Sequence, residues 1–289
     1  MKFEKWQALG NDYLIVEASD LAFELTPARV RRLCEGHFGV FADGVLLLSK
    51  PANPEHVADL RIFNPDGSEA ELSGNGAREA ILYLRRHWTD EDTFTIQTVA
   101  GEIKPTITGP DTCRVDMGRA SLRSADFPDG PEDGAGEAIS GGRSWTFRHV
   151  SIGNPQCAIH VPTLAELEAL DLPAIGPAIE AAAQFPNRTN VSWFTEAEPG
   201  APGRIRARIF ERGVGETLSS GTGATGAAIA HALEYDGAER PRSVTVLLDG
   251  GELEVEVEDD LHVNLTGWAR PVFEGRLSEE FEKELHETE

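Results

Sequence analysis

Two serines open nearly the same short motif in the two halves of this chain. Ser73 begins SGNGA and Ser220 begins SGTGA, and the difference between 220 and 73 puts them 147 residues apart in a chain of 289. Each motif leads into small residues at helical spacing, where serine is a favoured N-cap. A helix start carries unpaired N–H groups and a positive dipole end, so it binds carboxylates or phosphates. The pair predicts two helix starts that serve one anion site.

The likeness of the two motifs extends beyond the serines. Aligning Ser73 with Ser220 also superposes Glu69 on Glu216, Gly74 on Gly221, Gly76 on Gly223, Ala77 on Ala224 and Ala80 on Ala227. Either serine alone could be a simple helix cap with no further role. The repeat favours an internal duplication with a functional motif in each copy.

The second motif also fits a pattern typical of dinucleotide-binding loops. GTGATG, from Gly221 to Gly226, matches G-x-G-x-x-G,. That loop follows directly from a strand, whereas ERGVGETLSS separates these glycines from a strand expected to end near Phe210. The first copy, GNGARE, lacks the third glycine. A nucleotide-binding enzyme is therefore the weaker alternative.

Short β-rich runs separated by turn residues fill both halves, and each half has one helix led by its Ser-Gly-x-Gly-Ala motif,. The fold class expected is α/β (α+β), with two β-rich lobes. The Gly-, Pro- and acid-rich segment from Ala125 to Gly142 indicates a linker or long surface loop. The predicted organisation is a first lobe over 1–118 completed by a strand near 266–276, a second lobe over 119–265, and an acidic tail over 277–289.

Composition narrows the class of protein. The formal net charge is −23, which repels phosphate backbones and weighs against nucleic-acid binding. The three cysteines form no paired motif, and the eight histidines show no ligand spacing, so neither a disulfide framework nor a metal site is expected,. No window approaches the roughly 18 apolar residues of a membrane span. These features predict a cytoplasmic protein without a membrane partner.

Several polar clusters could bind a small zwitterion. They are GNDY, NPDGSE, GNPQ, PNRTN and ERG, in segments that otherwise read as turns,. Arg212 suits bidentate binding of a carboxylate, and Glu211 suits an ammonium group. Together they favour an amino acid as the small-molecule partner.

The motifs, taken in order, resemble those of the diaminopimelate epimerase family. LGNDY, FNPDGSEAELSGNGAR, VDMG, GNPQC, FPNRTNV and ERGVGETLSSGTGA follow the family's order across nearly the whole chain. The resemblance implies two pseudo-symmetric lobes, each a barrel-like mixed sheet around a central helix. It also implies movement of the proton at one α-carbon of diaminopimelate, converting the LL to the meso form in lysine biosynthesis without a cofactor. Members of the family often form homodimers.

The resemblance also assigns roles to residues. Gly74, Asn75, Gly221 and Thr222 would hold the reacting carboxylate at the two helix starts. The remaining polar groups of the substrate would be bound by Asn11, Asn64, Asn154, Asn190, Glu211 and Arg212.

The chain departs from the family at the reacting groups. The family's two catalytic residues are cysteines, and here those positions are Ser73 and Ser220; the family's usual histidine after GNP is Gln156. A thiol ionises near pH 8.5 and more readily at a helix N-terminus, whereas a serine needs an adjacent base. The nearest carboxylates in sequence are Glu216, Glu69, Glu211 and Asp66. Cys157 lies in a site motif but is not expected to be the catalyst.

Three functions therefore remain beside the nucleotide alternative. The first is a diaminopimelate epimerase with serines at both catalytic positions. The second is a related cofactor-independent racemase or isomerase for another amino acid. The third is a weak or inactive homologue that binds its amino acid.

Overall fold

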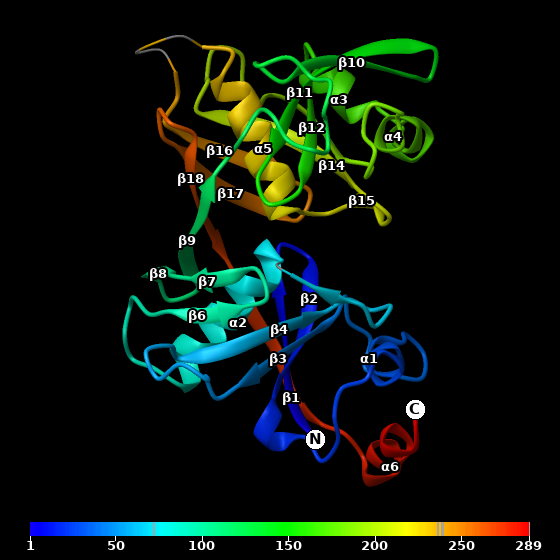
Figure 1. Ribbon diagram of the computed structural model, residues 1–289, viewed down its shortest axis with the longest axis vertical. Helices are drawn as coiled ribbons and strands as arrows, with labels where there is room; N and C mark the ends of the chain where they lie inside the picture. The colour runs from blue at the N-terminus through cyan, green and yellow to red at the C-terminus, as the bar shows by residue number, and fades with distance from the viewer. Residues whose placement is uncertain (72, 236, 238–239, 289) are drawn as a thin grey trace. The chain divides into compact units, whose positions relative to one another are not determined.

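The computed structural model describes residues 1–71, 73–235, 237 and 240–288. The chain forms two compact units, the first made of Met1–Val115 and Gly267–Glu289 and the second of Asp116–Thr266. The chain passes from the first unit to the second within β9 (Thr112–Arg119) and returns near the end of β18 (His262–Trp268) (Figure 1). The first unit is thus built from both ends of the sequence.

The first unit contains a mixed sheet with the order β19-β1-β2-β3-β4-β6-β7, in which β5 pairs with β4. The strands of this sheet are β1 (Lys2–Ala8), β2 (Asn11–Glu17), β3 (Val45–Ser49), β4 (Ala58–Phe63), β5 (Glu69–Ala70), β6 (Ile96–Thr98), β7 (Gly101–Ile103) and β19 (Arg270–Arg276). The first unit also contains β8 (Thr106–Gly109), which pairs with β9. Its helices are η1 (Ala18–Asp20), α1 (Pro27–Cys34), α2 (Gly74–His87) and α6 (Glu279–Glu287).

The second unit contains most of a sheet with the order β10-β11-β12-β13-β14-β16-β17-β18-β9-β8, in which β15 pairs with β14. Its further strands are β10 (Ala135–Ser140), β11 (Arg143–Ser151), β12 (Pro155–His160), β13 (Asn190–Glu196), β14 (Arg204–Glu211), β15 (Gly215–Thr217), β16 (Ser243–Leu248) and β17 (Gly251–Val257). Its helices are α3 (Leu164–Glu168), α4 (Leu172–Glu180) and α5 (Gly221–Ala232).

The two sheets repeat one pattern of strand pairing. β1, β2, β3 and β4 pair antiparallel, parallel and antiparallel in turn, as do β11, β12, β13 and β14. The short strand before each central helix keeps the same register, with Phe63 opposite Glu69 and Phe210 opposite Glu216. The predicted fold class, two pseudo-symmetric lobes with mixed sheets, is confirmed.

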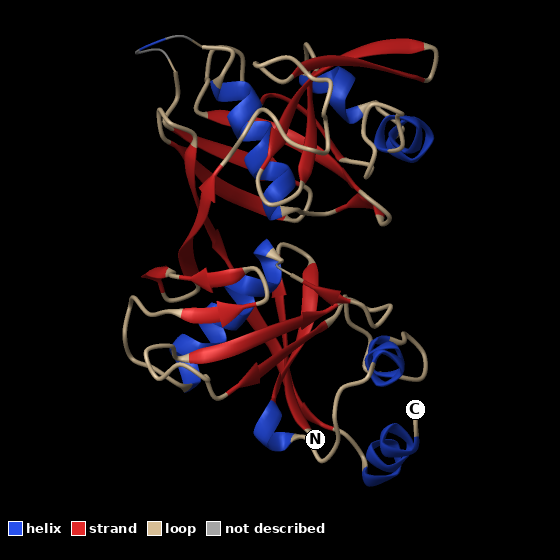
Figure 2. Ribbon diagram, in the orientation of Figure 1, coloured by secondary structure: helices blue, strands red, loops and turns tan. Residues whose placement is uncertain are grey.

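The central helix of each unit packs against its own sheet. α2 is buried from Asn75 to Leu84 and contacts β1, β2 and β3. α5 is built largely from glycine and alanine, and these small side chains let its backbone approach β12 and β13 closely. Figure 2 shows α5 lying along the strands of the second unit. Burial of nearly the whole helix fixes the position of its first turn.

One segment of the second unit is more ordered than its composition indicates. The segment Ala125–Gly142, predicted as a linker or surface loop, instead contains β10, which pairs with β11. That prediction is wrong because Ala138 and Ser140, two residues apart, are buried on one face of the strand,.

None of the described helices is long and apolar enough to cross a membrane.

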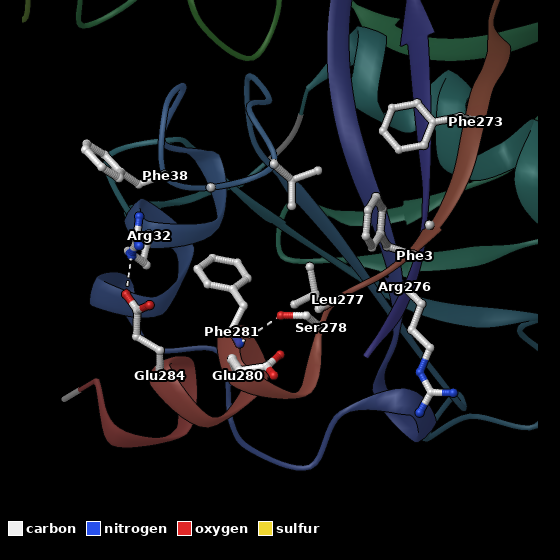
Figure 3. Close-up of a pocket in the computed structure, with 13 residues that line it drawn as sticks. Phe3, Arg32, Phe38, Phe273, Arg276, Leu277, Ser278, Glu280, Phe281 and Glu284 are labelled. Atoms are coloured by element: carbon white, nitrogen blue, oxygen red, sulfur yellow. Dashed lines mark hydrogen bonds and ion pairs between the residues drawn. The ribbon is translucent and has the colours of Figure 1, made fainter.

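The acidic segment at the end of the chain forms α6 and packs against α1. Ser278 caps this helix, and Leu285 is fully buried in the core of the first unit. Arg32 donates to the Glu284 carboxylate at 2.6 Å, and Arg29 donates to the Leu285 carbonyl at 2.7 Å. Figure 3 shows the Arg32–Glu284 pair beside a pocket of about 650 Å³. Arginines on α1 therefore hold the C-terminal helix in place.

Candidate functional site

In the first unit the candidate site is the start of α2. Ser73 has an extended backbone, and its Oγ accepts the Gly76 N–H at 3.1 Å, as an N-cap does,. The Tyr13 phenol, from β2, donates to the same Oγ at 3.2 Å. Gly74 and Asn75 form the first two positions of the helix, where backbone N–H groups have no partner within the helix,. This half-site offers a hydroxyl beside anion-binding amides.

A buried arginine braces this helix start. Arg78 donates to the Gly74 carbonyl at 2.9 Å and to the Asn75 side-chain oxygen at 2.6 Å. Burial lowers the pKa of its guanidinium, and the next side chain, Glu79, is also fully buried. Among the described residues, no side chain hydrogen-bonds to the Glu79 carboxyl group, which interacts with the Tyr13 backbone instead. Burial raises the pKa of Glu79 well above its ordinary value, so the carboxyl group favours its neutral form.

In the second unit the equivalent place is the start of α5. Ser220 is buried, and its Oγ accepts the Gly223 N–H at 3.2 Å. Thr222 accepts the Asn154 side-chain N–H at 3.3 Å, and Asn154 accepts the Gln156 side-chain N–H at 2.6 Å. The structure thus brings together Ser220, Thr222 and Asn154, three of the residues predicted for the site.

A second group of predicted residues lies at the ends of β13 and β14. The Asn190 side chain accepts the Arg212 backbone N–H at 2.9 Å and donates to the Pro155 carbonyl at 3.1 Å. The Arg212 side chain is exposed and donates to the Asn187 carbonyl at 2.8 Å. Asn190 therefore fixes the backbone of Arg212 and leaves part of the guanidinium open to a ligand.

The loop after Arg212 is held from α4 by a carboxylate that the sequence did not single out. Glu180 is buried, accepts the Gly213 N–H at 2.7 Å and pairs with Arg188 at 2.6 Å. Its only sequence signal was a glutamate on an otherwise apolar helix. The carboxylate positions the backbone on which Arg212 stands.

The other predicted binding residues have partners within their own units. Asn11 donates to Asp43 at 2.8 Å, and Asn64 donates to Ser68 at 2.9 Å. Glu211 accepts from the Thr217 hydroxyl at 2.9 Å. Each side chain is half-buried, so each is both oriented by the protein and open to solvent.

The carboxylates nearest to the serines in sequence are occupied elsewhere. Glu69 accepts two hydrogen bonds from Arg61, which lowers its pKa. Glu216 accepts two hydrogen bonds from Arg208 on one carboxylate oxygen. Asp66 accepts from the Ser68 hydroxyl and N–H, and these bonds lower its pKa. Among the described residues, the hydrogen bonds of Ser73 and Ser220 come from Gly76, Tyr13 and Gly223 and include no carboxylate.

The three cysteines are all buried in the cores of the two units. Burial raises the pKa of the Cys34 and Cys113 thiols to about 12, and raises that of Cys157 well above its ordinary value. A thiol with such a pKa stays protonated near neutral pH. Cys157 therefore does not take the place of a catalytic thiolate.

The chain forms two similar units, each with a mixed sheet and a serine-capped central helix, and solved structures share its fold. A phenazine biosynthesis protein of the PhzF family from Bacillus anthracis superposes with a TM-score of 0.68 at 18% identity, over 96% of this chain and 99% of that one. A probable proline racemase from Agrobacterium radiobacter gives 0.64 at 14% identity, over 96% and 93%. At these identities the likeness concerns the fold alone.

Sequence comparison identifies the family. The family model described as diaminopimelate epimerase matches residues 3–123 and 148–272. Diaminopimelate epimerase 2 from Nostoc sp. is 37% identical over 289 aligned positions, covering 97% of this chain and 96% of the relative. The diaminopimelate epimerase from Desulforudis audaxviator is 40% identical over 287, covering 96% and 99%. The chain belongs to the diaminopimelate epimerase family.

Proposed function

We propose that this protein is an isomerase that converts LL- to meso-diaminopimelate by proton transfer at one α-carbon. The observation that carries the proposal is the pair of equivalent helix starts, each with a serine N-cap. The family resemblance assigns the two catalytic positions to these serines. Family membership supplies the substrate, since relatives that align over nearly the whole chain are diaminopimelate epimerases. The reaction needs no cofactor, and the cytoplasm is its proposed location.

Each half-site has a proposed part in binding the reacting end of the substrate. The amides of Gly74 and Asn75 in one unit, and of Gly221 and Thr222 in the other, bind the carboxylate at the reacting carbon. The N–H groups of a first helical turn point outward along the helix axis, and with the helix dipole they make both positions favourable for an anion. Ser73 and Ser220 are the proposed acid and base residues.

The far end of diaminopimelate carries a second carboxylate and ammonium group. Arg212 suits the carboxylate because its planar guanidinium can donate two parallel hydrogen bonds. Glu211 suits the ammonium group because a carboxylate accepts from it directly. The amides Asn11, Asn64, Asn154 and Asn190 supply the remaining polar contacts.

A second function is favoured by one observation. The described hydrogen bonds give neither Ser73 nor Ser220 a carboxylate partner, and a serine needs a base to act at neutral pH. A homologue that binds its amino acid and turns it over weakly or not at all is therefore the alternative. The two functions differ in proton transfer and agree in binding.

Proton NMR of LL-diaminopimelate in deuterated water separates them. An epimerase replaces the α-proton by deuterium, and the signal decays with time. The decay is expected to vanish in Ser73→Ala. Absence of decay at high protein concentration, with the ligand still bound, would support the binding homologue and contradict the epimerase.

Thermal unfolding tests the substrate class independently of turnover. A ligand that binds only the folded protein raises Tm. Diaminopimelate is expected to raise it, whereas NAD and proline are not. A rise with NAD alone would support the nucleotide-binding alternative.

We propose in addition that the protein forms a homodimer through β19. Among the described strands β19 ends the sheet order, and Val272 and Phe273 on it are 55% and 44% exposed. Phe273 also lines the pocket of Figure 3. An apolar edge strand is a ready site for pairing with another chain.

Light scattering after size-exclusion chromatography tests the dimer. Phe273→Glu is expected to give a monomer, because it places a charge on the apolar edge. Ile139→Glu, at an apolar position of the second unit that is 76% exposed, is the control and should leave the mass unchanged. A monomeric wild-type protein would contradict the proposal.

A further inference from the structure

The Ser73 oxygen is the acceptor of two hydrogen bonds. The Gly76 N–H and the Tyr13 O–H donate to it at 3.1 and 3.2 Å. A hydroxyl oxygen has two acceptor lone pairs and one proton to donate. With both lone pairs occupied, the Ser73 proton is the part of the group left for a ligand. Two donors also stabilise the negative charge that the oxygen acquires when it gives that proton away.

The Tyr13 ring is held where it reaches the serine. Only 5% of the residue is exposed. A Cβ built on Gly44 would lie 2.6 Å from Tyr13 Cε1, so the ring occupies space that any other residue at position 44 would fill. The contact with Ser73 is therefore a fixed feature of the first unit.

The described residues of the second unit make no such contact at the equivalent place. β12 takes the position of β2, and Gln156 stands two residues after Asn154, as Tyr13 stands two after Asn11. The Gln156 amide donates to Asn154. Among the described residues, the hydrogen bond to the Ser220 oxygen comes from Gly223. Ser73 therefore has a phenol as a hydrogen-bond donor, whereas the equivalent residue near Ser220 is an amide that donates to Asn154.

We propose that Tyr13 is the proton-relay partner of Ser73, acting through the serine rather than on the substrate. The inference rests on the proposed epimerase function. As Ser73 protonates the α-carbanion, its O–H bond breaks and the carbanion's electron pair forms the new C–H bond. The Tyr13 proton moves to Ser73 Oγ, and the phenolate regains a proton from solvent.

The reverse reaction uses the same two groups. Ser73 Oγ takes the α-proton while its own proton passes to the Tyr13 phenolate, and the electron pair of the broken C–H bond stays on carbon. An ordinary phenol has a pKa of about 10 and is protonated at neutral pH. The resting pair of Ser73 and Tyr13 therefore holds a proton that it can donate. Ser73 is thus the acid in the direction of reaction in which it protonates the α-carbanion.

The relay can be tested without turnover by placing a titratable group at position 73. In Ser73→Cys the introduced thiol is followed by its alkylation rate against pH, and the buried native cysteines give little background. A donated hydrogen bond favours the thiolate, so adding Tyr13→Phe is expected to raise the thiol pKa by about one unit. Tyr83→Phe, which removes another buried phenol of this unit, bonded to Glu17, should leave it unchanged. Equal thiol pKa values with and without Tyr13 would overturn the relay.

Turnover supplies the second test, in the protein with its native serines. Tyr13→Phe is expected to slow α-proton exchange at least 10-fold, and Tyr83→Phe to leave it unchanged. Replacing Tyr13 by 3-fluorotyrosine, a more acidic phenol of nearly the same shape, should retain exchange and move the alkaline limb of its pH profile to lower pH. A purely structural ring would leave that limb in place, and this result would overturn the relay.

The outcomes distinguish the relay from the function on which it rests. Exchange by the wild type that is unaffected by Tyr13→Phe would leave the epimerase intact and remove the relay. No exchange by the wild type would contradict both the epimerase function and a catalytic role for Ser73 and Tyr13. The thiol titration would then still show whether Tyr13 donates to position 73.

Discussion

The starts of α2 and α5 show what the duplication kept and what it changed. Both serines accept the N–H of the third helical residue, at 3.1 and 3.2 Å. Arg61–Glu69 and Arg208–Glu216 bridge the strands ahead of the two helices with the same eight-residue spacing. The neighbours of the two serines differ. The backbone geometry of the N-cap is the same in both units. The Tyr13 phenol, which can exchange a proton with the N-cap serine, belongs to the first unit.

The second difference lies one turn further along each helix. Glu79 and Gly226 are equivalent, since they follow Ser73 and Ser220 by six residues. Glu79 is a buried carboxyl group, whereas a Cβ on Gly226 would lie 2.8 Å from Gln156 Cβ. In the second unit Gln156, on β12, therefore occupies the space beside α5. In the first unit Glu79, on α2, occupies the equivalent space, and Tyr13, on β2, reaches the N-cap serine.

The largest effect is expected from replacing both N-cap serines by cysteine, the residue that the family resemblance implies at these positions. Ser73→Cys with Ser220→Cys is expected to raise the exchange rate of diaminopimelate by about 10²–10⁴-fold, because a thiol at a helix N-terminus ionises near neutral pH. NMR in deuterated water measures it. Ser219→Cys, the same change one residue before the second cap, should give no gain. An unchanged rate in the double variant would contradict the assigned positions.

Glu79→Gln tests the buried carboxyl group of the first unit. Because its folded pKa lies above the unfolded value, the stability that it contributes is complete below about pH 4.3 and is lost as pH rises through the folded pKa. The neutral amide avoids this loss, so its advantage should grow by about 1.4 kcal/mol for each pH unit between those two pKa values.

Hydrogen exchange of α2 and α5, compared at pH 5 and pH 8, measures this gain separately in each unit after correction for the intrinsic rate. α2 should become more protected at pH 8, and α5 should not change. Glu71→Gln, an exposed position of the same unit, is the control. A gain that does not depend on pH would contradict a raised pKa at Glu79.

Alanine at each cap sharpens the comparison of the two serines. Ser220→Ala should cost about 1 kcal/mol, the usual value of an N-cap. Ser73→Ala should cost about 2 kcal/mol, because it also removes the hydrogen bond that the buried Tyr13 phenol donates to Ser73,. Chemical unfolding measures both. In the Tyr13→Phe background the two costs should become equal, and a persistent difference would need another cause.

The smallest effect is expected at Gly226. Alanine is a better helix former than glycine by about 1 kcal/mol, but its Cβ would press on Gln156, and overpacking costs about 1–3 kcal/mol. Gly226→Ala should therefore destabilise the second unit by about 1 kcal/mol. Gln156→Ser in the same chain should restore the stability, and a double-mutant cycle measures the coupling.

Sequence alone could predict the features that depend on local structure. N-capping involves residues three apart, so Ser73 and Ser220 were identifiable from their motifs, and both cap their helices. The pairing of Arg61 with Glu69 was also within reach, since Arg208 and Glu216 repeat the same spacing. That repeat indicates a cross-strand pair rather than a general base. Composition misled at β10, where glycine, proline and acids obscured the alternation of buried residues.

The partner of Ser73 was beyond sequence reasoning because it depends on tertiary structure. Tyr13 precedes Ser73 by 60 residues, and only the packing of α2 on β2 brings them together. Glu180 reaches Gly213 in the same way from a helix 33 residues earlier. Periodicity predicts which face of an element is buried, but it does not predict which distant side chain meets it.

The place of β19 beside β1 has a consequence for synthesis on the ribosome. Lys2 pairs with Arg276, so β1 waits for a strand 274 residues further along the chain to be translated. The second unit is continuous in sequence and can fold while the remainder is still being made. The first unit closes late, by a long-range pairing of the kind that slows folding. Until then the nascent chain exposes one side of β1, and a chaperone that shields strand edges has its longest opportunity there.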